Sequence, residues 1–317
     1  MTLLVVTAAL TAALTADLVV ETEPGPIRLG VGLAKGASVR LEVEHDLRSV
    51  ASVGESVLES GMVYTQRVDL IVSSVADDGS MTGRISLGAI RGTVKDVLGK
   101  EVAFSSEDED VRYPPFAALW INQAKVQAGV ELPMTLSPDG TIRVDGYAEH
   151  LEEDEDQYDL VESLGFDTTG EAFNQSVQLF LVRMPPGPVG VGAAWSHDVA
   201  LRLQGRDHVF ETEHALRRVD DAVAEVDLSA VIEAPDAPPL PDPAKPPTVK
   251  DMLNAVRRLD ASLIGSATLS RADGLPLRYS LQRTLAFETP HPVTRQPMRN
   301  DVIETFVVTR APEESRE

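Results

Sequence analysis

The stretch VRLEVE at residues 39–44 alternates strictly between apolar and charged side chains. Because successive side chains of a strand point to opposite faces, this period of two predicts a strand with one buried face and one hydrated face. Similar alternation recurs at residues 68–72, 85–87, 199–203, 224–232, 263–269, 275–281 and 302–308. The chain is therefore predicted to be mostly β.

Three tight turns join segments of this kind, at ADDG (76–79), SPDG (137–140) and RADG (271–274). In each turn the glycine supplies the positive φ that the last position requires. Strands that are joined so closely run antiparallel. The turns therefore predict an antiparallel meander and argue against a parallel strand-helix-strand fold.

The centre of the chain has helical spacing instead. Residues 114–127 begin with two prolines, which the first turn of a helix tolerates, and residues 146–164 and 171–184 place apolar side chains at helical periods. We predict an α+β fold, predominantly antiparallel β, with a strongly curved sheet or half-barrel around two or three central helices. A weak likeness between the segments that begin at Gly36 and Gly192 leaves open whether one continuous sheet or two duplicated sheets are present.

These patterns divide the chain into five parts. Residues 1–16 are predicted to be a signal peptide, 17–145 a first β meander with a short helix, and 146–187 a helical segment. Residues 188–310 are predicted to be a second meander with a proline-rich excursion at 233–249, and 311–317 a disordered tail.

The first 16 residues, MTLLVVTAALTAALTA, are an uncharged apolar run that ends in small residues. This pattern is typical of a secretory signal with cleavage after Ala16 or Ala13, although no Lys or Arg precedes the apolar stretch. A wrongly assigned start codon and a buried first strand are the alternatives. No later segment is long and apolar enough to span a membrane, so an exported protein, periplasmic or extracellular and soluble, is expected.

The composition excludes several classes of partner and site. The 317 residues carry a formal net charge of -22, which repels phosphate backbones, so nucleic acid is not an expected partner. The chain has no cysteine, which excludes disulfides, thiolate metal sites and a lipid-modified cysteine.

No catalytic, cofactor or metal site is predicted. Ser196, His197 and Asp198 supply the residue types of a hydrolase triad, but adjacent strand residues face opposite ways and no Gly-x-Ser-x-Gly elbow occurs. His208 and His214 would lie about 20 Å apart on a strand, too far to share one metal ion. The acidic runs at 107–110 and 152–156 lack the spacing of a calcium loop and are interpreted as solvated faces.

Aromatic side chains offer a different kind of candidate site. If the sheet is bent enough, they could line a cavity for an acyl chain rather than cap a packed core. The candidate lining residues are Phe116, Trp120, Phe173, Phe180 and Phe210. The first functional hypothesis is therefore a non-catalytic protein that carries an apolar ligand or a lipidated partner. The alternative is a structural or protein-interaction module of the cell envelope without a small-molecule ligand. Lipid or another envelope protein is the expected partner, and the oligomeric state is left open.

Several turn and strand-start motifs occur together: Lys35-Gly36, VELPMTLSPDG (130–140), VDG (144–146), MPPGPV (184–189) and VGAAW (191–195). In combination they resemble an uncharacterised family of exported bacterial β-rich proteins, a domain of unknown function. The resemblance covers nearly the whole mature chain, implies an exported β-rich domain, and carries over no catalytic residues. More loosely, the expected fold is similar to the half-barrel carriers of lipoproteins and lipids in bacterial envelopes.

Overall fold

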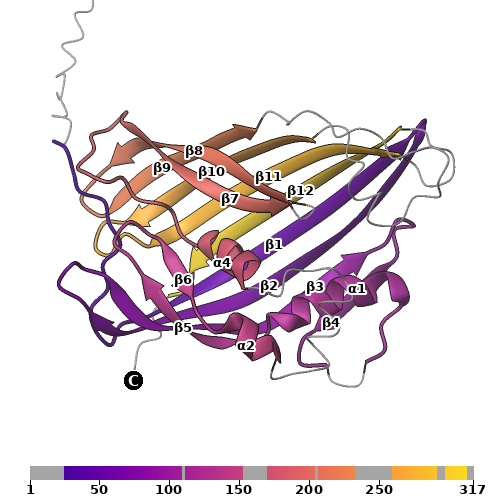
Figure 1. Cartoon of the computed structure of the whole chain (residues 1–317), viewed down its shortest axis with the longest axis horizontal. Helices are drawn as coiled ribbons and strands as arrows, with labels where there is room; N and C mark the ends of the chain where they lie inside the picture. Colours follow the sequence, from indigo (N-terminus) through magenta and orange to yellow (C-terminus); the bar gives the residue numbers. More distant parts are fainter. Residues whose placement is uncertain are drawn as a thin grey trace, which may run out of the picture.

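The protein is described by a computed structural model over residues 25–108, 111–152, 170–203, 206–232, 259–290 and 297–312. Within these ranges the chain forms one 12-stranded sheet in the order β6-β5-β3-β2-β1-β12-β11-β10-β9-β8-β7, with β4 paired to β3. The sheet curves into an open trough that holds the helices on its inner side (Figure 1). The prediction of a strongly curved, mostly antiparallel sheet is confirmed.

The elements of the described ranges are as follows. The strands are β1 Ser38–Val53, β2 Ser56–Val75, β3 Met81–Lys95, β4 Glu101–Ser105, β5 Glu131–Leu136, β6 Ile142–Val144, β7 Ala194–Leu203, β8 Arg206–Val219, β9 Val223–Ile232, β10 Leu259–Ser270, β11 Pro276–Pro290 and β12 Pro297–Arg310. The helices are α1 Pro115–Val126, α2 Tyr147–Glu152 and α4 Glu171–Gln178. No helix of the described ranges is both long and apolar enough to cross a bilayer.

One long-range pairing makes the sheet continuous. β1 and β12 pair antiparallel from Leu41 opposite Arg310 to Ser52 opposite Arg299. This pairing joins the strands that precede residue 145 to those that follow residue 188. The alternative that the sequence left open is thus decided in favour of one continuous sheet. The three predicted turns at 76–79, 137–140 and 271–274 connect β2 to β3, β5 to β6 and β10 to β11.

The helices match the prediction only in outline. α1 agrees with the helical spacing at 114–127, but α4 ends at Gln178, well before residue 184. Beyond Gln178 the chain is no longer helical, and the backbone N–H of Met184 donates to the carbonyl of Asp139 at 2.8 Å instead of to a helical carbonyl. Of the predicted helix at 146–164, the structure describes α2, and residues 153–164 lie outside the described ranges. The predicted signal peptide and the excursion at 233–249 lie outside them as well, as does most of the predicted tail.

The alternation in the strands places one row of apolar side chains on the inner face of the trough. Val39, Leu41 and Val43 of β1 are buried, whereas the charged residues between them face outward. A large apolar cluster fills the trough beneath α4 and the β5–β6 hairpin, and a smaller one lies between α1 and β2 to β4. Burial of these rows, at about 25 cal/mol per Å² of apolar surface, is the main stabilising contribution to the fold.

Candidate functional site

A cavity of about 280 Å³ lies between α4, the segment that follows it and the inner faces of β7 to β11. Its apolar lining consists of Leu179, Leu181, Val199, Leu228, Leu263, Tyr279 and Leu281. Polar side chains, among them Arg183, Thr212 and His214, line the same space. Apolar walls with a few convergent polar groups are typical of sites for small ligands.

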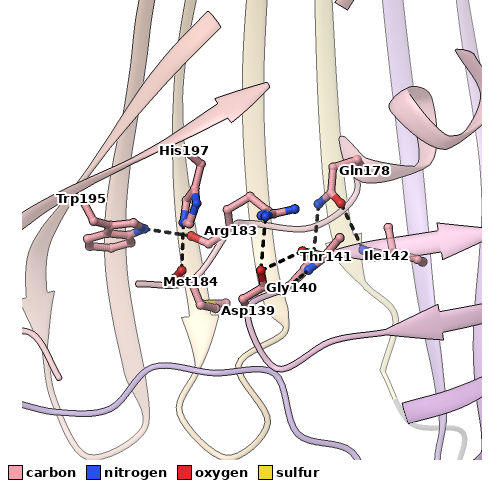
Figure 2. A network of polar contacts seen from close by, with 9 residues as sticks. All are labelled: Asp139, Gly140, Thr141, Ile142, Gln178, Arg183, Met184, Trp195 and His197. Carbon is pink, nitrogen blue, oxygen red and sulfur yellow. Dashed lines mark hydrogen bonds and ion pairs between the residues drawn. The ribbon is translucent and has the colours of Figure 1, made fainter. Parts of the chain in front are cut away.

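Two amide side chains hold α4 against one edge of the sheet. β6 is the last strand on that side, so its outer backbone groups have no strand partner. The Asn174 side chain accepts from the Val144 N–H at 2.6 Å and donates to the Val144 carbonyl at 2.9 Å. One helical turn later, Gln178 accepts from the Ile142 N–H at 3.1 Å and donates to the Gly140 carbonyl at 3.0 Å (Figure 2). Residues four apart share a helix face, so the two amides continue the ladder and shield the edge.

The opposite edge of the sheet is tied to the same region. The indole N–H of Trp195, on β7, donates to the carbonyl of Arg183 at 3.0 Å. His197 Nε2 lies 2.9 Å from the carbonyl of Met184, so this nitrogen carries the proton and donates (Figure 2). Because Met184 N–H also donates to Asp139, residues 183–184 bridge β7 and the β5–β6 turn. We call this bridge the seam; it joins the two edges of the sheet, and its Arg183 lines the cavity.

An ion pair lies within the seam. Arg183 Nη2 is 3.2 Å from Asp139 Oδ2, and Asp139 also accepts from the Thr141 backbone N–H at 2.9 Å and from its hydroxyl at 2.8 Å. Burial by itself would raise the pKa of Asp139, but the hydrogen bonds from Thr141 and the charge of Arg183 outweigh it and hold the pKa below its usual value. The positive charge of Arg183 is therefore matched by a neighbouring carboxylate.

Two polar atoms beside the cavity have no hydrogen-bond partner among the described residues. Thr212 is 3% exposed, yet its hydroxyl oxygen makes no hydrogen bond within the described part of the chain, and the same is true of the buried Nε of Arg183. His214 Nδ1 lies 3.2 Å from the Thr212 carbonyl and donates to it, which leaves Nε2 with its lone pair. Burial, and secondarily the nearby His197 ring, lowers the pKa of His214 to about 4, so the imidazole is neutral at pH 7. Buried polar groups without partners are rare and call for an explanation.

The buried His214 predicts a specific pH dependence of stability. Its pKa falls from 6.5 in the unfolded chain to about 4 in the folded one, so the unfolded chain binds more protons between these values. The contribution of neutral His214 to the free energy of unfolding is complete above pH 6.5 and is lost as the pH falls toward 4. The total loss is roughly 3 kcal/mol. Urea unfolding of wild type and His214→Gln across this interval checks it. The variant is expected to have the shallower slope, and parallel slopes would contradict the assignment.

A second polar cluster lies on the inner face at the centre of the sheet. Glu304 of β12 contacts His45 of β1 at 2.9 Å and pairs with Arg283 of β11. The His45 ring stacks on Phe306 with centroids 4.2 Å apart. Burial would raise the pKa of Glu304, but the Arg283 charge and the His45 hydrogen bond prevail and lower it to about 2. Burial, with the negative charge of Glu304 second, raises the pKa of Tyr64 on β2. Glu304 is therefore a buried carboxylate that depends on its two partners.

Three of the five aromatic residues predicted to line a cavity can be placed in the structure, and they lie in two separate clusters. Phe173 and Phe180 are buried in the large apolar cluster, and Phe116 packs against the smaller cluster at α1. None of these three is among the described residues that line the cavity. The side chains of Trp120 and Phe210 lie outside the described part.

The sequence did carry a signal for some residues that line the cavity. Thr212 alternates in phase with His214 and Leu216 along β8, and all three are buried. Within the described ranges, no group of three or more His, Asp or Glu side chains could hold a metal ion.

Comparisons with known proteins give only weak likenesses. No protein-family model matches the sequence, and no curated protein is significantly similar to it. Lipovitellin aligns at a TM-score of 0.42 and 10% identity over 90% of this chain, but the alignment spans only 26% of the lipovitellin chain. DynF from the dynemicin biosynthesis pathway of Micromonospora chersina aligns at 0.21 and 7% identity, over 93% of this chain and 90% of DynF. A DUF1329 family protein from Desulfovibrio piger aligns at 0.16 and 9% identity, over 88% of both chains. At these levels the likenesses establish neither a family nor a function, and the resemblance to an uncharacterised exported family stays a prediction.

Proposed function

We propose that this protein is a non-catalytic carrier that holds an apolar ligand, or the acyl part of a lipidated partner, in the cavity beneath α4. The observation that supports the proposal is a largely apolar space of about 280 Å³ that lies inside an otherwise packed trough. The space is partly open to solvent, so a molecule can enter it, and small ligands bind preferentially in concave sites with largely apolar walls.

The polar groups of the cavity favour binding over catalysis. A hydroxyl acts as a nucleophile only with an adjacent base, and the Thr212 hydroxyl makes no hydrogen bond to His214 or to any other group of the described residues. Ser196 and Asp198, which flank His197 on β7, have exposed side chains, as the alternation of a strand requires. The arrangement therefore supports a role in holding a molecule rather than transforming it.

Obstruction of the cavity tests the proposal. Leu263→Trp places an indole in the cavity wall, so the amount of apolar ligand that co-purifies is expected to fall about tenfold, the effect of a penalty of about 1.4 kcal/mol. Native mass spectrometry of the protein, followed by extraction and identification of the released molecule, measures the occupancy. The same intact mass shows whether residues 1–16 have been removed, as the proposed export requires.

The matched control is Ile264→Trp. Ile264 follows Leu263 on β10 but is 57% exposed on the outer face, so this variant should keep wild-type occupancy. Circular dichroism checks that both variants fold, and Leu263→Phe replaces the tryptophan variant if it does not. A wild-type protein that is empty after purification and binds no added apolar molecule would refute the carrier role and favour the interaction module instead.

A further inference from the structure

The cavity beneath α4 is amphipathic in a specific way. Five leucines form much of its apolar wall, and eight polar residues complete the lining. Two polar atoms of this lining, Arg183 Nε and the Thr212 hydroxyl, are buried and make no hydrogen bond within the described residues. To bury a donor without a partner costs the desolvation of that group, so such a pair is stable only where something compensates for it. Neither atom has appreciable accessible surface, so a small rotation of its side chain would bring it to a ligand oxygen in the cavity, which would supply the partner that both lack.

The donor and acceptor inventory narrows the chemistry of that atom. Arg183 Nε–H can only donate, the Thr212 hydroxyl can donate or accept, and His214 Nε2 can only accept while the ring is neutral. A ligand oxygen can satisfy the first two groups, and a ligand hydroxyl can in addition donate to a neutral imidazole. A pure hydrocarbon would leave Arg183 Nε and the Thr212 hydroxyl without a partner.

The charges around the cavity oppose an anion. The Arg183 guanidinium is already paired with Asp139 at 3.2 Å. Glu171 and Asp198, both with exposed side chains, add negative charge to the lining. A ligand carboxylate would lose its hydration on entering the cavity. It would find there one cation, Arg183, which is already neutralised, and the carboxylates of Asp139, Glu171 and Asp198, so its binding is unfavourable.

The size of the cavity limits the apolar part. At about 280 Å³ it lies at the lower end of ligand pockets, which typically measure about 300–1,000 Å³. Such a space accommodates one medium-length chain and not a lipid with two or more chains.

From these observations we infer that the ligand is an uncharged, single-chain amphiphile, an alcohol or ester, whose oxygen accepts hydrogen bonds from Arg183 Nε and the Thr212 hydroxyl while its chain lies against Leu228, Leu263 and Leu281. This inference rests on the proposed carrier function and specifies the substrate class of the same site.

Three probes with the same chain and different head groups test the inference: 1-octanol, octanoate and 1-chlorooctane, titrated into ligand-free protein by calorimetry at neutral pH. Wild type is expected to bind 1-octanol about tenfold more tightly than either of the others, the effect of one good hydrogen bond. Thr212→Val keeps the shape of the side chain and removes the hydroxyl. It should weaken 1-octanol binding about tenfold and leave 1-chlorooctane binding unchanged.

Thr65→Val, on the exposed face of β2, is the matched control and should alter none of the three affinities. Equal losses for 1-octanol and 1-chlorooctane in Thr212→Val would indicate a packing defect and overturn the inference. Octanoate as the tightest probe would overturn it too, while leaving the carrier function intact. If no probe binds wild type, and Leu263→Trp behaves like wild type, the carrier function itself fails.

Discussion

Glu304→Ala is expected to lower the free energy of unfolding by about 3–5 kcal/mol, the usual cost of removing one partner from a buried ion pair. The substitution leaves the Arg283 guanidinium buried without its carboxylate and leaves His45 Nε2 without the oxygen it contacts at 2.9 Å. His45 Nδ1 and Arg283 Nε already make no hydrogen bond among the described residues, so the cluster holds no spare partners to compensate. Urea denaturation at neutral pH, followed by circular dichroism, measures the loss.

Glu44→Ala is the control, because Glu44 precedes His45 on β1 but faces outward and is exposed. Its removal should change the free energy of unfolding by no more than about 0.5 kcal/mol. If the two variants were equally stable, Glu304 would not be the electrostatic centre of the inner face.

The same carboxylate fixes the acid limit of stability. The pKa of Glu304 is 4.5 in the unfolded chain and about 2 in the folded one, so its contribution is complete above pH 4.5 and is lost as the pH falls toward 2. The groups that face it are His45, Arg283 and Tyr64, from the three other central strands. The difference between the two pKa values corresponds to roughly 3 kcal/mol in the free energy of unfolding. Glu304→Gln has a similar shape without the titration, and it should lack this part of the acid unfolding curve.

The alternation of apolar and polar residues in the sequence already indicated that the charged residues of this cluster face inward. Phe306 and Val308 define the inward phase of β12, and Glu304 lies in the same phase. Arg283 lies likewise between the inward Leu281 and Leu285 of β11. A charged residue that interrupts a buried row is costly unless it is paired, so its position alone predicts a partner.

What the sequence could not provide was the identity of the partner. His45 and Glu304 are brought together because β1 pairs with β12, although 259 positions separate them in the chain. Local periodicity fixes which face a side chain occupies but not which strands become neighbours, since that choice depends on the closure of the whole sheet. The strands and their turns depend on local sequence and could be predicted, whereas the strand order depends on distant pairings and could not.

The cavity was hidden from the sequence for a related reason. The helical spacing at 171–184 correctly marks the start of α4, but nothing local shows that the chain leaves the helix after Gln178 to form the seam. In the sequence, Asn174 and Gln178 resemble ordinary exposed helix residues. Only the structure shows that their side chains bond to the free edge of β6. The lining residues Leu179 and Leu181 follow from that unpredicted end of the helix. Of the aromatic residues that the sequence favoured as lining, Phe173 and Phe180 pack in the large apolar cluster and Phe116 packs against the smaller one.

Gly140→Ala is also expected to lower the free energy of unfolding strongly, because this position requires both a positive φ and the absence of a Cβ. Its φ is +79°, a region that costs an L-residue about 1–2 kcal/mol. A Cβ at this position would also lie 2.3 Å from the carbonyl oxygen of Val182, so the backbone immediately before the seam must move, and the seam with it. We expect a loss of at least about 3 kcal/mol in the free energy of unfolding, measured by urea denaturation.

Gly99→Ala separates the two requirements. Gly99 has a φ of +80° at the end of the β3–β4 turn, but a Cβ there meets nothing within 4 Å. This variant should lose only about 1–2 kcal/mol. The excess loss in Gly140→Ala then measures how strongly the seam resists displacement. Because Arg183 directly follows Val182, the same displacement moves the guanidinium beside the cavity. Gly140→Ala should therefore also retain less co-purifying ligand than Gly99→Ala, and equal retention would mean that the seam does not shape the cavity.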